Sequence, residues 1–295
     1  MRPAAYSFIR YEITDQYDEP ITSSQHGDIL KLVDQVEVPH RKRDPQKSDF
    51  DTFVFNPESK KVKAEPVVAF NIGKRITSRI EHRLKNGQIE MVSVPADDIH
   101  WSRVVMVPRL SIAAVRDGSG DRLAARSAIS RVRSVFRHAL NYEFLSEQTG
   151  NPQDVDRALS RLGLTDFAFT VVPFNPHPRV PGDRLDELLQ ESNVGRLRAD
   201  AKPKPGGLMN SEGDGILKEV RGLSEAGYGQ FGFKGLTKEA GSEVTYKKPK
   251  FESTKEENIE RRRRPTEMRA SIPSGDEKHS EEEQVVMTIL ELYDG

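Results

Sequence analysis

The chain has 295 residues, of which 35% are hydrophobic and 31% are charged, and it contains no cysteine. The lack of cysteine excludes disulfides, thiolate metal sites and cysteine nucleophiles, and no apolar stretch reaches the roughly 20 residues of a membrane span. We therefore expect a soluble, cytoplasmic protein with no membrane contact. Because the hydrophobic fraction is low and the charged fraction is high, we expect part of the chain to stay disordered outside the core.

Residues 1–102 predict a β-rich N-terminal lobe or an extension of the main sheet. The elements expected there are, in chain order, a strand (4–13), a short helix (28–36), a basic loop (40–47), a hairpin (51–72), a helix (73–87) and a strand (88–94). We expect Asn56 and Pro57 to form the turn of the hairpin, and Asn86 with Gly87 to end the helix.

Residues 103–250 predict an α+β core domain. The expected elements are a strand (103–115), helices (121–145 and 154–163), a strand (166–174), a helix (183–192), a strand (195–203), a helix (216–227) and a hairpin (228–250). This order indicates a mostly antiparallel or mixed sheet with helices on one face, and it is compatible with ferredoxin-like elements.

The composition changes at Phe251, where charged residues begin to dominate. We expect 251–284 to be a charged, flexible linker and 285–295, with the apolar run "VVMTILELY", to be a docking segment. This segment either returns to the domain as a final strand or binds a partner, which would allow homo- or hetero-oligomers.

The predicted helix 121–145 carries arginines beside its apolar face and has no acidic residue between Arg122 and Tyr142. The arginines expected on one flank are Arg122, Arg126, Arg133 and Arg137. Rows of guanidinium groups match a phosphate backbone or an acidic protein surface. The alternative is that acids of a neighbouring helix, such as Asp186 and Glu187, pair with them.

The stretch "EAGYGQFGFKGL" (225–236) partly matches the RNA-recognition strand consensus. Gly-Tyr-Gly is present, but the leading basic residue is missing and Gln230 occupies an aromatic position. Strand alternation predicts that Phe231 and Phe233 lie in the core. The stretch is therefore expected mainly to pack.

The open face of this strand pair is expected to be basic. Tyr228 offers one stacking contact and Lys234 one positive charge, and the next strand adds Lys247 and Lys248. We expect these four residues to contribute to a nucleic-acid-binding surface, although one aromatic side chain makes a poor stacking platform.

The net charge of −1 hides an uneven distribution. Seven acidic residues and one lysine lie between Gly275 and Gly295, so the rest of the chain is net positive. The tetra-arginine at 261–264 could fold against this acidic tail, and the tail could compete with nucleic acid for the basic surface. Such masking would be autoinhibitory.

Catalytic patterns are sparse. The seven histidines, including His177, show no metal-ligand spacing, and no P-loop, nucleophile elbow or dinucleotide fingerprint is present. We expect no cofactor and assign no metal. A metal-dependent nuclease built from converging acids such as Asp166, Asp183 and Glu219 stays open.

The order of "FVFNPESKKVKAEP", "VVPFNPHPRVPGDRLDELLQESNVGRLRA", "GILKEVRGLSEAGYGQFGFKG" and "SEVTYKKPK" over 51–250 resembles an uncharacterised bacterial family associated with mobile elements and phage defence. The resemblance implies a bacterial accessory role and no activity. We expect a non-enzymatic nucleic-acid-binding or assembly protein. A metal-dependent nuclease and a protein-interaction subunit of a larger complex are the alternatives.

Overall fold

The structure is a computed structural model that describes residues 3–21, 25, 28, 52–85, 88–118, 122–173, 183–209, 215–225, 228–247, 267–273 and 279–294. The expected helix 28–36 and the basic clusters 40–43 and 261–264 therefore lie outside the described residues, apart from residue 28. So do His177 and Lys248. The chain forms two compact units: an N-terminal unit, Ala4–Glu147, and a C-terminal unit, Gln148–Gly295 with Met1–Pro3.

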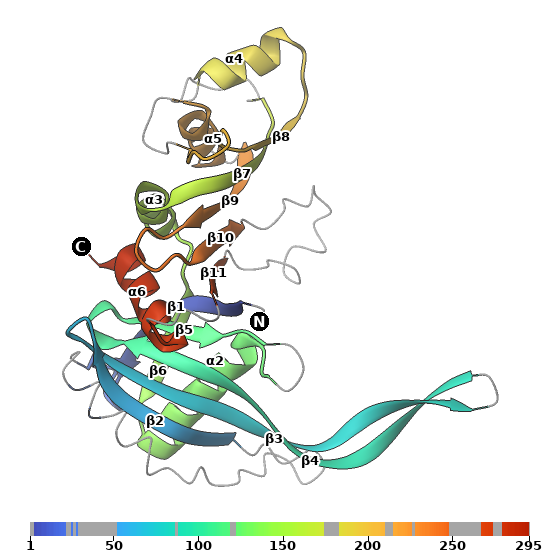
Figure 1. Cartoon of the computed structure of the whole chain (residues 1–295), viewed down its shortest axis with the longest axis vertical. Helices are drawn as coiled ribbons and strands as arrows, with labels where there is room; N and C mark the ends of the chain where they lie inside the picture. Colours follow the sequence, from blue (N-terminus) through green and yellow to red (C-terminus); the bar gives the residue numbers. More distant parts are fainter. Residues whose placement is uncertain are drawn as a thin grey trace. The chain divides into compact units, whose positions relative to one another are not determined.

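The N-terminal unit is built on a sheet with the strand order β2-β3-β4-β5-β1, and β6 also pairs with β1 (Figure 1). Its strands are β1 (Ala4–Thr14), β2 (Thr52–Val62), β3 (Glu65–Lys85), β4 (Gln88–Val107), β5 (Ile112–Arg116) and β6 (Glu143–Gln148). The pairs from β2 to β1 along this order are antiparallel. The predicted boundary between the N-terminal lobe and the core domain falls between residues 102 and 103. Both residues lie inside β4, so this boundary divides a strand.

One helix, α2 (Ala125–Val135), packs on this sheet and continues into a π-helical turn, Phe136–Leu140. Ala128 and Val132 of α2 share a buried cluster with Phe70 of β3 and Val104 of β4. The small and β-branched residues on the inner face of α2 allow the helix to lie close to the sheet.

The predicted helix over 73–87 is wrong, because residues 73–85 belong to strand β3. β3 pairs with β4 as far as Lys85 and Gln88, which leaves a two-residue connection between the strands. The expected single strand 103–115 is interrupted by a 3-10 turn, Pro108–Leu110. Proline at residue 108 cannot donate a hydrogen bond to a sheet ladder.

The hairpin over 51–72 is confirmed, but its turn lies later than expected. Lys63 and Ala64 have φ angles of 47° and 68° and connect β2 to β3. Asn56, with φ 50°, instead lies where the pairing of β2 with β3 shifts register between Phe55 and Glu58. Asparagine tolerates this left-handed conformation in a bulge as well as in a turn.

The C-terminal unit has the antiparallel strand order β11-β10-β9-β7-β8. Its strands are β7 (Gly163–Val171), β8 (Leu197–Ala201), β9 (Gly229–Leu236), β10 (Glu243–Lys247) and β11 (Glu267–Ile272), and its helices are α3 (Pro152–Arg161), α4 (Asp183–Glu191), α5 (Ile216–Glu225) and α6 (Glu281–Tyr293). The predicted strands and helices between 154 and 247 are confirmed in type. The α+β class is likewise confirmed, whereas a ferredoxin-like arrangement is not shown and stays a prediction.

The end of the chain differs from the expectation of a linker and a docking strand. Glu267–Ile272, inside the expected linker, forms β11 and pairs with β10. The run "VVMTILELY" belongs to helix α6, which packs on α3 and β11. Val285, Val286 and Ile289 are fully buried, so this segment is part of the core of its own unit.

None of the helices in the described ranges is long and apolar enough to cross a membrane.

Candidate nucleic-acid interface

Helix α2 presents an exposed basic flank and has no acidic residue. We call Arg126, Arg133 and Arg137 the arginine flank; all three side chains are exposed, opposite the buried Ala128 and Val132. No carboxylate of the described residues forms an ion pair with Arg126 or Arg137. A helix without acids cannot neutralise its own guanidinium groups by pairs four residues apart.

Arg122 is not part of this flank, which corrects the four-arginine prediction. The helix begins at Ala125, whose backbone N–H donates to Asp117 Oδ1 at 3.2 Å. Arg122 precedes it, and its guanidinium lies 4.8 Å from the ring centroid of Trp101. The N-terminus is therefore capped by an acid from a loop, and Arg122 serves a cation–π contact.

The guanidinium group of Arg133 takes part in packing within the N-terminal unit. Its Nη2 donates to the backbone oxygen of Ser146 at 2.7 Å and to Ser146 Oγ at 2.8 Å, which ties α2 to β6. Asp186 and Glu187, the acids considered as partners of the flank, lie on α4 of the C-terminal unit, where Asp186 accepts a hydrogen bond from Gln190. Arg126 and Arg137 are therefore the members of the flank with no role in this packing.

A second basic group, Arg131 and Lys74, lies at the point beyond which β3 no longer pairs with β2. Arg131 Nη1 donates to Thr52 Oγ1 at 2.9 Å, and Thr52 is the cross-strand neighbour of Lys74. Desolvation and the positive charge of Arg131 lower the pKa of Lys74, and burial lowers the pKa of Arg131. The repulsion between these two cations indicates that they lie close to each other in the N-terminal unit.

The glycine-rich strand β9 packs as expected. Phe231 and Phe233 are buried, and Tyr246 of β10 lies 5.7 Å and 5.2 Å from their ring centroids. A Cβ atom on Gly235 would lie 2.8 Å from Leu162 Cβ, so glycine is required there for close approach.

The open face of this strand pair is less basic than the sequence suggests. Lys234 is exposed but forms an ion pair with Glu243 at 3.7 Å. Tyr228 is half-buried. Its backbone N–H donates to the backbone oxygen of Leu223 at 2.8 Å, and its backbone oxygen accepts the N–H of Val172 at 2.9 Å. Lys247 is the last residue of β10 and Lys248 lies outside the described residues, so of the three lysines expected at this face only Lys234 has a described side chain.

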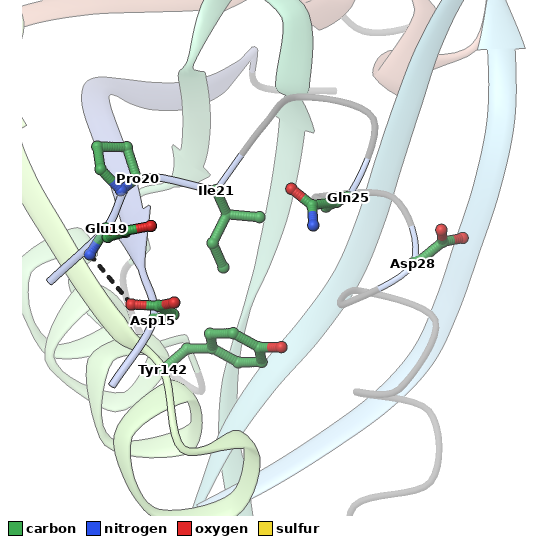
Figure 2. A pocket seen from close by; sticks show the side chains of 7 residues that line it. All are labelled: Asp15, Glu19, Pro20, Ile21, Gln25, Asp28 and Tyr142. Atoms are coloured by element: carbon green, nitrogen blue, oxygen red, sulfur yellow. Dashed lines mark hydrogen bonds between the residues drawn. The ribbon is translucent and has the colours of Figure 1, made fainter. Parts of the chain in front are cut away.

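The N-terminal unit has a pocket of about 420 Å³. Figure 2 shows the residues that line it: Asp15, Glu19, Pro20, Ile21, Gln25, Asp28 and Tyr142. Asp15 Oδ1 accepts the backbone N–H groups of Tyr17 at 2.8 Å and Glu19 at 3.0 Å. The Asp15 carboxylate therefore stabilises the turn that follows β1.

Within the described ranges, no group of three or more histidine and acidic residues could hold a metal ion. The acids considered for a nuclease, such as Asp166 on β7 and Glu219 on α5, thus belong to no such group.

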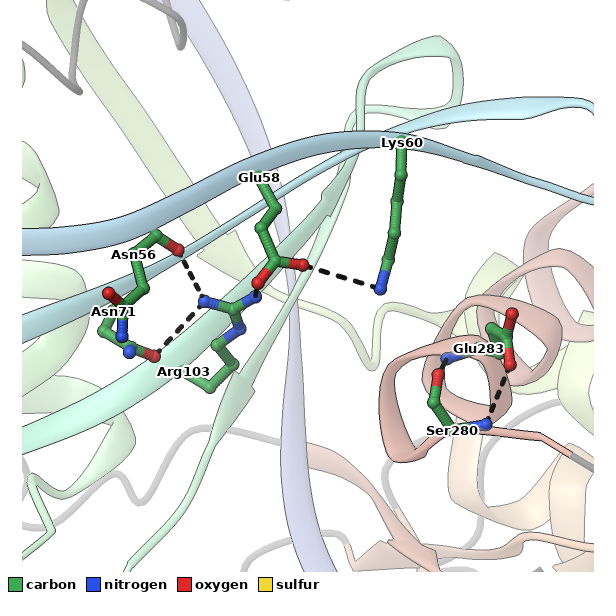
Figure 3. A network of polar contacts seen from close by, with 7 residues as sticks. All are labelled: Asn56, Glu58, Lys60, Asn71, Arg103, Ser280 and Glu283. Atoms are coloured by element: carbon green, nitrogen blue, oxygen red, sulfur yellow. Dashed lines mark hydrogen bonds and ion pairs between the residues drawn. The ribbon is translucent and has the colours of Figure 1, made fainter. Parts of the chain in front are cut away.

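Arg103 forms a polar network at the bulge of β2, as Figure 3 shows. It is buried, and its guanidinium contacts the backbone oxygen of Asn56 at 2.9 Å, Asn71 Oδ1 at 3.4 Å and Glu58 Oε1 at 3.2 Å. Glu58 also pairs with Lys60 at 3.7 Å. The residues of this network satisfy one another, so it holds the bulge together.

Comparisons with family models, curated proteins and solved structures gave no match. The assignment of a candidate nucleic-acid interface therefore depends on the sequence and geometry of this chain alone.

Proposed function

We propose that this chain is a non-enzymatic nucleic-acid-binding protein, and that the exposed arginine flank of α2 contacts the phosphate backbone. The observation that carries the proposal is the pair Arg126 and Arg137, exposed on a helix with no acid of its own. Arg131 and Lys74 add a second positive region in the same unit. Two separate positive regions suit a polyanion better than one small anion.

The chemistry of the flank favours phosphate over base edges. Guanidinium groups donate in a planar fork that matches two phosphate oxygens, and such contacts position a nucleic acid without reading its sequence. Tyr228, the aromatic residue expected on the open face of β9, is half-buried and offers little stacking surface. We therefore propose binding with little sequence preference and a strong dependence on salt.

The element order noted in the sequence resembles a bacterial family of mobile-element and phage-defence neighbourhoods, and we propose an accessory role in such a system, in the cytoplasm. In that role the protein would hold nucleic acid or assemble on it. An acidic protein is the rival partner for the same flank, because a carboxylate surface also accepts guanidinium hydrogen bonds.

A fluorescence-anisotropy titration tests the proposal, with labelled single- and double-stranded DNA and RNA and the full chain. Arg126→Gln with Arg137→Gln is expected to weaken binding about tenfold, the effect of about 1.4 kcal/mol. Arg196→Gln with Arg198→Gln is the matched control, because these arginines are also exposed but belong to the C-terminal unit. An equal loss of nucleic-acid affinity in both double variants would contradict the assignment of the arginine flank as the binding surface.

A further inference from the structure

The exposed side of α2 carries a continuous row of hydrogen-bond donors. Ser130 is exposed between the arginines of the flank, and we call Arg126, Ser130, Arg133 and Arg137 the donor row. At about 100° per residue, these four positions lie within roughly 60° of one another around the helix axis. Guanidinium and hydroxyl groups both donate to phosphate oxygens, so the row can contact phosphates along its whole length.

The donor row has a fixed length. At about 1.5 Å per residue, the Cα atoms of Arg126 and Arg137 lie roughly 16 Å apart along the helix. Arg133, between them, donates to the backbone oxygen and the Oγ of Ser146. Helix geometry and packing on β6 therefore keep the charges of the row at spacings that do not adjust to a ligand.

Acidic groups lie at both ends of the donor row. At the N-terminal end, Asp117 Oδ1 accepts the backbone N–H of Ala125, so a carboxylate occupies the place where a helix binds an anion. At the other end, Asn141 Nδ2 donates to Gln16 Oε1 at 3.3 Å, and Gln16 follows Asp15 in the chain. A phosphate backbone is repelled at both ends and is therefore limited to the side of the helix.

The donor row offers no stacking surface. Within Ala125–Leu140, all of which the structure describes, Phe136 is the only phenylalanine, tyrosine or tryptophan, and it packs on Phe144 with both rings buried. Tyr17 is 75% exposed, but its backbone N–H binds the carboxylate of Asp15 in the acidic turn after β1. Proteins that bind single strands combine positive charge with exposed aromatic rings, and α2 supplies the charge alone.

A duplex matches such a row better than a single strand does. Duplex DNA carries one charge per about 1.7 Å of its axis, so a row of roughly 16 Å lies opposite about nine charges, twice the number on one strand. Base pairing also holds the phosphates of a duplex at regular spacings, whereas a flexible strand must be ordered to match fixed cations, which costs affinity. The bases of a duplex are already stacked and need no aromatic platform.

We propose that the donor row binds double-stranded nucleic acid in preference to single strands, with α2 lying lengthwise against the phosphates of the duplex. This inference rests on the proposed function and adds to it the class of nucleic acid. Because acidic groups lie at both ends of the row, the contact covers about five base pairs, at about 3.4 Å each.

Fluorescence anisotropy tests the preference by comparing a labelled duplex with each of its strands alone, for the full chain at one salt concentration. We expect the duplex to bind about tenfold more tightly than either strand, because it presents twice the charge over the same length. The comparison is made once with DNA and once with RNA, so that the two sources of a duplex are distinguished.

Ser130→Glu tests the placement of the duplex on the donor row. Glutamate is a good helix former, and here it places a carboxylate four residues from Arg126 and three from Arg133. We expect duplex affinity to fall about tenfold. Ser160→Glu, at an exposed serine of α3 in the C-terminal unit, makes the same change of charge and should leave duplex affinity unchanged.

The outcomes separate this inference from the proposed function. Single strands that bind as tightly as the duplex, with binding lost in Ser130→Glu, would overturn the duplex preference and leave α2 as a nucleic-acid interface. An equal loss of affinity in Ser130→Glu and Ser160→Glu would overturn the placement on α2. A chain that binds no oligonucleotide would overturn the proposed function and this inference with it.

Discussion

The arginines of the N-terminal unit divide into those that the fold uses and those that it leaves at the surface. Arg103 and Arg133 donate to several protein oxygens, whereas the exposed Arg126 and Arg137 form no ion pair with a described carboxylate. The sequence predicts the acid-free helix, because the absence of acids is visible in the chain itself. It cannot separate Arg133 from Arg137, because the partner Ser146 is brought near only when β6 packs beside β1.

Arg103 should contribute to stability in proportion to the groups that it satisfies. Arg103→Met leaves the backbone oxygen of Asn56 and the side chain of Asn71 without this donor, and we expect a loss of about 2 kcal/mol in the free energy of unfolding. Lys60→Met removes an ion pair that is largely at the surface and should cost less than about 0.5 kcal/mol. Denaturant unfolding of both variants measures the difference, and equal effects would contradict the role of Arg103.

Tyr246 should make stability depend on pH in the alkaline range. Burial raises the pKa of Tyr246 to about 12 from an ordinary value of 10.0. Above pH 10 the unfolded chain loses this proton while the folded chain keeps it, so the free energy of unfolding falls between about pH 10 and pH 12. Tyr246→Phe should flatten part of this decline in denaturant titrations, and an unchanged slope would contradict it.

At the scale of elements, the most informative error is the helix predicted over 73–87. Ile76, Ile80 and Leu84 recur every four residues, a spacing that satisfies one helix face and also one strand face. Asn86-Gly87 was interpreted as a helix end, yet the same pair between two alternating segments is a strong hairpin signal. The pairing with "QIEMVSV" decides in favour of the strand, because each strand supplies the other's backbone partners.

Helix α6 was missed because its apolar run is too short to show a clear helical period. The signal that could have identified it precedes the run. Ser280 Oγ accepts the backbone N–H of Glu283 at 3.3 Å, and the Glu283 carboxylate accepts the backbone N–H of Ser280 at 2.8 Å. This reciprocal pair is a capping box, which is readable from Ser-x-x-Glu in the sequence.

Removing the acidic tail is not a clean test of the masking role considered for it, because the tail includes helix α6 and its buried residues. A chain that ends before Glu281 loses a helix with a fully buried apolar face, and we expect the C-terminal unit to lose cooperative unfolding. Ser280→Ala removes only the cap and should lower the free energy of unfolding by about 1 kcal/mol. Circular dichroism melts distinguish the two, and a truncated chain as stable as the full one would contradict this account of α6.

At the scale of the whole molecule, the two compact units carry different kinds of surface. In the N-terminal unit the described residues present the arginine flank and the exposed apolar residues Ile80, Ile89 and Met91 of the β3–β4 hairpin. In the C-terminal unit the carboxylates of Glu283 and Glu291 accept backbone N–H groups of their own unit. The sequence predicts the α+β class and the basic helix, because local patterns encode both. It does not predict the exposed apolar face of the β3–β4 hairpin, because whether another strand or helix covers that face depends on the tertiary structure.

The measurement that tests the central claim most directly is the salt dependence of nucleic-acid affinity, for the full chain and for Arg126→Gln with Arg137→Gln. On duplex DNA, the account predicts that the logarithm of affinity falls linearly with the logarithm of salt concentration. The double variant should reduce this slope by about 2, one for each lost phosphate contact. A chain that binds no oligonucleotide at low salt, or a variant with an unchanged slope, would contradict the assignment of the arginine flank as a nucleic-acid interface.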